Sequence, residues 1–176
     1  MARVRAFPFS ELLAQEPERW ARLVGDHEST IDQLVYDAEA QRSEDGGPAA
    51  RVVRGRRCAD RRGLFQEFAA AFQFPDYFGE NFDALDECLC DMKWLQADAY
   101  VVALTNADAV LPNDDAGFDT LMSVLGSAAM EWHRSTALGA AERPSVPFRV
   151  LLHVAPDKQG ALKARLERAG VPFVAG

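Results

Sequence analysis

Acidic side chains gather in one short stretch of the sequence. Between Phe74 and Asp98 there are seven carboxylates and one lysine, Lys93, which leaves six net negative charges in 25 residues. The carboxylates are Asp76, Glu80, Asp83, Asp86, Glu87, Asp91 and Asp98. Groups of this kind can bind a metal ion, act as an acid–base pair, or present negative charge to a cationic partner.

The residues around these carboxylates predict a helix with two different faces. Pro75 ends the helical pattern before it, Gly79 allows a turn, and Asn81 can cap a new helix that runs to about Cys90. Apolar residues of that helix fall within an arc of about 120°, at Phe82, Leu85, Cys88, Leu89 and Met92. Carboxylates occupy the opposite side over about 140°, at Asp83, Asp86, Glu87 and Asp91. We therefore expect one buried face and one acidic face.

Folding alone does not require this acidic face. Like charges at spacings i, i+3, i+4 and i+8 repel one another, and only Asp83 lies close enough to the helix N-terminus to gain from the dipole. Two interpretations stay open at this point. The face can be a solvated surface, or it can be a rigid array of carboxylates presented to a cationic groove.

An enzyme would need further chemical groups beside these carboxylates. Asp83 and Glu87 could form a pair for acid–base or Mg²⁺ chemistry, but the sequence has no nucleophile elbow, phosphate loop or His-x-x-x-His helix. The histidines, His27, His133 and His153, are far apart in the sequence. We therefore predict no enzyme activity, no catalytic residue, no cofactor and no metal site.

The cysteines do not predict a disulfide framework or a zinc site. Cys58, Cys88 and Cys90 are odd in number, and a Cys-x-Cys pair in a helix directs its two thiols about 200° apart. We expect reduced, partly buried thiols.

Length and composition are typical of one folded domain. The chain has 176 residues, of which 48% are hydrophobic, and this is enough to bury a core. The net charge of -8 argues against general nucleic-acid binding and suits a cationic partner or simple solubility. Because there is no apolar run of about 18 residues and no signal-peptide core, we predict a cytoplasmic protein without a membrane contact.

The first 49 residues are predicted to form a mainly helical extension. A helical pattern begins near residue 10, although Pro17 would have to lie in its first turns or break it. Its apolar members are Leu12, Leu13, Trp20 and Leu23. A second apolar stretch at 31–36 is followed by a polar stretch at 39–48 that is rich in chain breakers and predicts a linker. The predicted division is an extension over residues 1–49 and a domain over residues 50–176.

Strand and helix patterns alternate beyond the linker. Short apolar runs predict strands at 51–54, 100–104 and 148–154. Helical spacing covers 63–72, 118–133 and 162–169 in addition to the acidic helix, and Asn113, Asp114 and Asp115 are capping candidates for the longest of these. Strands joined by helices predict a parallel α/β core.

A cluster of arginines comes directly before the acidic stretch. It consists of Arg51, Arg54, Arg56, Arg57, Arg61 and Arg62, and with Asp60 it carries a net charge of about +5. These side chains could contact nucleic acid. We favour ion pairs within the chain or simple solvation, and we predict no direct nucleic-acid partner.

One motif resembles a known family. The run from Pro75 to Leu89, with the pattern Tyr-x-Gly-x-Asn-x-Asp-Ala-Leu starting at Tyr77, is very similar to a segment of the barstar family of intracellular ribonuclease inhibitors. The similarity continues without gaps back to Val52 and Val53, and with the later strand, helix and strand it covers about residues 50–154. The resemblance implies a barstar-like α/β fold with a three-stranded parallel sheet packed with helices.

The resemblance also implies roles for individual residues. Tyr77 would pack on the catalytic histidine of a ribonuclease, and Gly79 would allow close backbone approach. Asp83 would meet cations that hold RNA phosphates, and Glu87 stands at the position of the family's main aspartate. We expect Glu80, Asp86 and Asp91 to steer the partner by charge. The predicted partner-binding residues are Tyr77, Gly79, Glu80, Asn81, Asp83, Asp86, Glu87 and Asp91.

Departures from the family pattern leave two functions open. The family's tryptophan is replaced by Asp86, a carboxylate of a later helix has no counterpart, and residues 1–49 have no match. The first prediction is an inhibitor of a basic, extracellular-type microbial ribonuclease, as in immunity to a toxin. The alternative is a barstar-like immunity or interaction module that binds another protein. The oligomeric state stays open.

Overall fold

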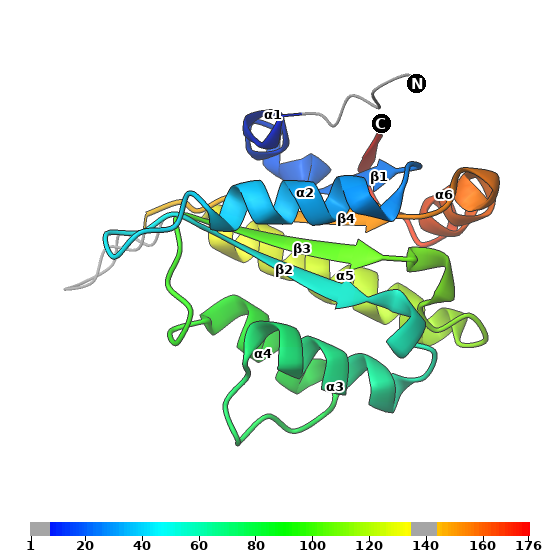
Figure 1. Cartoon of the computed structure of the whole chain (residues 1–176). Coiled ribbons are helices and arrows are strands. Elements are labelled where there is room, and N and C mark those ends of the chain that lie inside the picture. The colour runs from blue at the N-terminus through cyan, green and yellow to red at the C-terminus, as the bar shows by residue number, and fades with distance from the viewer. Residues whose placement is uncertain (1–7, 135–143) are drawn as a thin grey trace.

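The structure is a computed structural model that describes residues 8–134 and 144–176. Helices and strands alternate along most of the chain (Figure 1). In chain order they are α1 (Phe9–Leu13), β1 (Ala21–Val24), α2 (Glu28–Glu39), β2 (Pro48–Arg54), α3 (Arg61–Phe72), α4 (Phe82–Asp91), β3 (Ala99–Thr105), α5 (Asp115–His133), β4 (Phe148–His153), α6 (Gln159–Arg168) and β5 (Phe173–Ala175).

The strands form one parallel sheet in the order β2-β3-β4-β1-β5. The α/β class is confirmed, but the prediction of three strands was wrong, because the sheet has five. The additional strands are β1, from the segment predicted to be mainly helical, and β5, from the C-terminal tail. Pro17 begins a short 3-10 turn, which separates α1 from the strand at Ala21–Val24.

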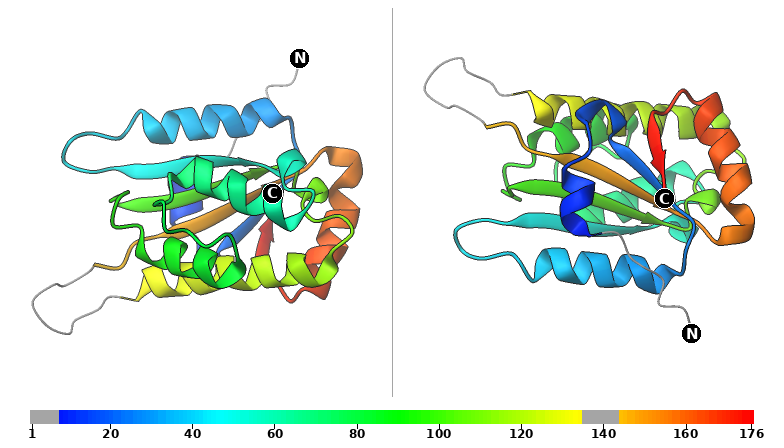
Figure 2. Two further views of the ribbon diagram at one scale, coloured as in Figure 1. Left: turned by 90° about the horizontal axis from the view of Figure 1, so that it is seen from below. Right: turned by 90° about the horizontal axis from the view of Figure 1, so that it is seen from above.

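Helices cover both faces of the sheet. Helices α3, α4 and α5 lie on the side seen from below in Figure 2, and α1 and α2 lie on the opposite side. Alternation along β3 divides its side chains between two cores, since Tyr100 and Val102 pack with α3 to α5, while Val101 and Ala103 pack with α1 and α2. The parallel sheet is therefore buried on both faces, as parallel sheets usually are.

The N-terminal segment is fixed to the sheet by polar contacts as well as by packing. The guanidinium of Arg149, on the central strand β4, donates to the carbonyls of Leu12 (3.2 Å), Leu13 and Gln15 at the end of α1. The carbonyl of Leu12 also accepts a 3.4 Å hydrogen bond from the backbone N–H of Gln15, and the arginine adds hydrogen bonds at this helix end, where carbonyls run out of partners within the helix. Burial lowers the pKa of Arg149. The division at residue 49 stays a prediction. Residues 8–47 nevertheless contribute strand β1 to the sheet and two helices, α1 and α2, that pack on it.

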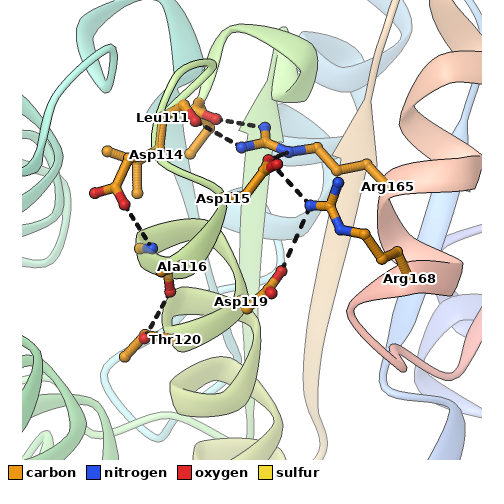
Figure 3. Close-up of polar contacts among 10 residues, drawn as sticks. Leu111, Asp114, Asp115, Ala116, Asp119, Thr120, Arg165 and Arg168 are labelled. Atoms are coloured by element: carbon orange, nitrogen blue, oxygen red, sulfur yellow. Dashed lines mark hydrogen bonds and ion pairs between the residues drawn. The ribbon is translucent and has the colours of Figure 1, made fainter.

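The C-terminal segment is held against α5 by arginines (Figure 3). Arg165 of α6 donates to the carbonyls of Val110 (2.7 Å) and Leu111 (2.6 Å), and its guanidinium lies 3.7 Å from the centre of the Phe118 ring. Arg168 pairs with Asp115 at 3.0 Å. These contacts fix α6 and leave the exposed side of α4 uncovered.

Candidate functional site

The helix α4 begins and ends where local side chains and backbone geometry dictate. Asn81 Oδ1 accepts a 2.9 Å hydrogen bond from the backbone N–H of Ala84, which confirms Asn81 as the N-cap. At the other end Met92 adopts a left-handed conformation (φ 37°) and turns the chain back. The predicted helix is confirmed to within one residue at each end, and the side chain of Asn81 is used by the helix itself.

The apolar face of α4 is buried, as the arc predicted. Leu85, Cys88, Leu89 and Met92 are buried and Phe82 is half-buried. The Trp132 indole N–H on α5 donates to the carbonyl of Leu89 at 2.7 Å, which ties the two helices together. Burial of each of the two leucines contributes about 2 kcal/mol, so α4 is a firm support for the residues on its other face.

The loop 73–81 is fastened to α3 and α4 by aromatic rings. Phe78 packs edge-on against Phe65 of α3 and Phe74 of the loop, with ring centres 6.3 and 4.9 Å apart. Phe74 also packs edge-on against Trp94, whose indole N–H donates to the carbonyl of Phe72 at 2.9 Å. The inner side of the loop is therefore anchored, and its outer side is presented to solvent.

Tyr77 is the outermost aromatic residue of this loop. It is 76% exposed, although its neighbours Phe74 and Phe78 point inward to the ring cluster. An exposed tyrosine on an anchored loop can bury a large ring at low entropic cost when a partner binds.

The turn after Tyr77 differs from the expectation in one detail. The left-handed residue is Glu80 (φ 48°), whereas Gly79 is not among the residues with positive φ. A Cβ at Gly79 would lie 3.1 Å from Nδ2 of Asn81, so a side chain there would crowd the capping residue. Gly79 and Glu80 are both exposed, next to Tyr77.

The acidic face consists of Asp83, Asp86, Glu87 and Asp91. Asp83 and Glu87 are exposed, and Asp86 and Asp91 are partly buried. Asp91 pairs with Lys93 at 3.0 Å, but the other members of the acidic face form no ion pair with any residue that the structure describes. Burial, and then the charges of Glu87 and Asp91, raise the pKa of the Cys88 thiol.

Three of the predicted residues meet at one pocket. A hollow of about 390 Å³ between the loop and α4 is lined by Tyr77, Phe78, Ala84, Glu87, Cys88, Cys90, Asp91 and Trp94. Gly79, Glu80, Asn81, Asp83 and Asp86 do not line it. The remaining carboxylates of the stretch, Asp76 and Asp98, do not line the pocket either. Asp76 is exposed on the loop, and Asp98 accepts a hydrogen bond from the backbone N–H of Gly47.

Comparison with known proteins gives the family. The sequence model of the family described as Barstar (barnase inhibitor) matches residues 49–153, which include the loop 73–81 and α4. The chain belongs to the barstar family. A search of curated proteins found no match.

Membership of the barstar family gives the site a general meaning. The chain carries a barnase-inhibitor-like module, and the family implies a protein partner, in general a ribonuclease. The matched range begins in β2 and ends in β4, so α1, β1, α2, α6 and β5 lie outside it. Within the barstar family range, Tyr77, Glu87 and Asp91 line one pocket between the loop and α4.

Five residues that line the pocket were not among the predicted site residues: Phe78, Ala84, Cys88, Cys90 and Trp94. Cys90 lies on α4 between the two faces, and Trp94 comes after the helix end, where a helical wheel does not apply. The left-handed Met92 brings Trp94 back to the loop. A tryptophan four residues beyond the predicted helix end at Cys90 was the one available sign.

The arginine cluster divides into members with and members without an ion pair to a described residue. Arg51 pairs with Glu39, Arg54 with Glu67, and Arg61 with Asp114, each at 2.6 Å. Arg56, Arg57 and Arg62 are exposed. The expectation of ion pairs within the chain is therefore confirmed for half of the cluster.

Metal binding, membrane crossing and the cysteines were also assessed in the described residues. Within residues 8–134 and 144–176, no three His, Cys, Asp or Glu side chains are grouped so as to hold a metal ion. Over the same ranges, no helix has the length and apolar character needed to cross a membrane. Cys58 and Cys88 are buried and Cys90 is half-buried, and burial followed by the charge of Glu67 raises the pKa of Cys58 to about 12.

Proposed function

We propose that this protein binds and inhibits a basic, extracellular-type microbial ribonuclease through the acidic face of α4 and Tyr77. The observation that carries the proposal is the exposed carboxylates of Asp83 and Glu87, which form no ion pair with any described residue and lie on α4 beside the exposed Tyr77, in a member of the barstar family. Such a surface suits a groove that is lined with Arg, Lys and His for binding RNA.

The mechanism is competition with the substrate. A carboxylate that lies where an RNA phosphate would lie pairs with the same cations of the enzyme. The enzyme therefore cannot bind the inhibitor and RNA at the same time. Asp83 and Glu87 are one helical turn apart and both exposed, which suits them to meet two neighbouring phosphate sites. Glu80, Asp86 and Asp91 add to the negative field that speeds encounter.

The other predicted residues have supporting roles. Tyr77 would provide the apolar centre of the interface, and Gly79 leaves room for the partner's backbone. Asn81 acts through the helix, because its side chain is occupied by the cap. The proposal assigns the chain no catalytic step and no direct contact with nucleic acid, and it places the protein in the cytoplasm.

The test is inhibition of a panel of small secreted microbial ribonucleases, at low and at physiological salt. The double variant Asp83→Ala/Glu87→Ala should lose at least about 100-fold in affinity, because two charged interface groups are removed. The matched control is Asp32→Ala/Asp37→Ala, which removes two exposed charges from α2 on the other face of the sheet. The control should change affinity by less than about threefold, through steering alone.

A second function is favoured by the surface of α2. Tyr36 is 70% exposed there, beside the exposed Asp32 and Asp37, and it lies outside the range matched to the barstar family. This surface would serve an immunity or interaction module that binds a protein other than a ribonuclease. Failure to inhibit any ribonuclease of the panel would contradict the first proposal and favour this one.

A further inference from the structure

The strand β2 forms the longer of the two outer edges of the sheet. It has seven residues and, among the described strands, pairs with β3 alone, whereas the opposite edge strand, β5, has three residues. An unpaired edge presents backbone N–H and C=O groups that a strand of another molecule can bind. The short β5 offers few such groups, so β2 is the edge at which unwanted pairing would begin.

Two glutamates occupy N–H groups along the β2 edge. The carboxylate of Glu39, at the end of α2, accepts a hydrogen bond from the backbone N–H of Ala50 at 2.8 Å. The carboxylate of Glu67, on α3, accepts one from the backbone N–H of Arg54 at 3.1 Å. The two helices lie on opposite sides of the sheet (Figure 2), so the edge is covered from both sides. Glu39 lies outside the range matched to the barstar family.

Arginine side chains hold these carboxylates at the edge. Arg51 pairs with Glu39 at 2.6 Å and also donates to the carbonyl of Ala50 at 3.0 Å. Arg54 donates two hydrogen bonds to Glu67, of 2.6 and 3.1 Å. Because a paired carboxylate is restrained by its arginine, each glutamate stays in position to accept the backbone N–H.

Val52 is the gap between the two glutamates. Backbone groups of a strand point alternately to its two sides, so the N–H of Val52 faces outward like those of Ala50 and Arg54. In the part of the chain that the structure describes, no side chain is bonded to the N–H or the carbonyl of Val52. One free residue does not suffice for another strand to bind, because strand pairing requires a row of hydrogen bonds.

We propose that Glu39 and Glu67 are guards that prevent β2 from pairing with β2 of a second copy of this chain. Two copies related by a two-fold axis would bring their β2 strands together antiparallel. With Val52 opposite Val52, the N–H of Ala50 in one copy would face the carbonyl of Arg54 in the other. Both guards would have to move before these bonds could form. The inference concerns the sheet edge and does not depend on which partner α4 binds.

The test is the association state of the full chain without its guards. Glu39→Ala/Glu67→Ala should dimerise at least about tenfold more tightly than the original chain in sedimentation velocity over a range of concentrations. Glu39→Gln/Glu67→Gln keeps an acceptor oxygen for each N–H and should behave as the original chain does. The proposal is overturned if the alanine variant unfolds cooperatively and stays monomeric, or if the alanine and glutamine variants associate equally.

Two further variants separate strand pairing from a general loss of stability. Val52→Pro removes the central outward N–H, and an edge strand tolerates proline at such a position. Added to Glu39→Ala/Glu67→Ala, it should return the chain to a monomer. Asp114→Ala removes the partner of Arg61 and the cap of α5, away from β2, and should leave the association state unchanged. Association that persists with Val52→Pro, or that appears with Asp114→Ala, would contradict the proposal.

A peptide probe carries the test if the double alanine variant does not unfold cooperatively. The side chain of Glu39 is 35% exposed, so Glu39→Ala removes one guard without opening the core. It frees the N–H of Ala50 next to the outward groups of Val52. A synthetic peptide of residues 48–54 should bind ¹⁵N-labelled Glu39→Ala at least about fivefold more tightly than the original chain, with shifts of the Ala50 and Val52 amide resonances. Equal binding to both, or no binding to Glu39→Ala, would show that the glutamate does not guard the edge.

Discussion

Helices α4 and α2 lie on opposite sides of the sheet and are of similar length, 10 and 12 residues, but their exposed residues have different surroundings. On one face, α4 has exposed carboxylates, and the pocket and the exposed Tyr77 lie next to it. On the other, α2 also exposes a tyrosine, Tyr36, between exposed carboxylates. The difference lies in what supports each tyrosine, since Tyr77 belongs to a loop anchored by aromatic packing while Tyr36 lies on a regular helix. Exposure and charge alone therefore do not define a binding site.

The faces also differ in how they hold a buried charge. Glu67 of α3 is buried and pairs with Arg54 through Oε1 at 2.6 Å. Arg149 is buried on the opposite face, and carbonyl groups hold it there. On one face the buried charge is paired within the barstar family range, by Arg54 and Glu67. On the other face the buried charge of Arg149 binds carbonyl groups of the N-terminal segment.

The largest effect should come from deleting the segment whose helices, α1 and α2, cover the second face of the sheet. Deletion of residues 1–47 would expose Val101, Ala103 and Leu151, and it would leave β5 without its neighbour β1. We expect no cooperative thermal unfolding of residues 48–176 by circular dichroism, because a parallel sheet requires cover on both faces. A cooperative transition near that of the full chain would show that the predicted domain of residues 50–176 folds alone.

The next largest effect should separate the two tyrosines. Tyr77→Ala should raise the inhibition constant for a ribonuclease that the protein inhibits by about 30-fold or more, as expected for a central interface residue. Tyr36→Ala should change it by less than about twofold. Enzyme kinetics with both variants measures this directly, and a larger loss for Tyr36→Ala would assign the interface to α2.

Sequence patterns predicted the acidic helix better than the sheet, for physical reasons. The cap at Asn81 and the apolar arc are local features, and local features decide a helix. The strands β1 and β5 are four and three residues long, too short for a period, and the spacing of Trp20 and Leu23 imitates a helix. The pocket depends on Trp94, which the backbone at Met92 places there, and no pattern of residue types shows that geometry.

A smaller effect should distinguish the buried carboxylate of Glu67 from the half-buried carboxylate of Glu39. Burial alone would raise the pKa of Glu67, but hydrogen bonds and charge from Arg54, with the charge of Arg57, lower it below its ordinary value. Ionised Glu67 therefore stabilises the fold above its unfolded-state pKa, and that stabilisation is lost as the pH falls through the lower folded-state pKa. Glu67→Gln should cost about 1 to 2 kcal/mol near neutral pH.

Urea unfolding from pH 7 down to pH 3 measures this contribution. The Glu67→Gln variant should lose less stability on acidification than the original chain, because it lacks the group that must be protonated. Glu39, which pairs with Arg51 on the other side of β2, is the control, and Glu39→Gln should cost less than about 1 kcal/mol. Equal acid sensitivity of the Glu67→Gln variant and the original chain would contradict the assignment.

The smallest effect concerns how the two helices begin. Asn81 caps α4 with its side chain, whereas His27 at the same position of α2 makes no such bond. Asn81→Ala should therefore lower the free energy of unfolding by about 1 kcal/mol, and His27→Ala should change it by less than about 0.5 kcal/mol. Urea unfolding of both variants gives the comparison. If Asn81→Ala also weakens binding of the partner beyond its effect on stability, the cap positions Asp83 and Glu87 for the interface, and α4 differs from α2 in this respect too.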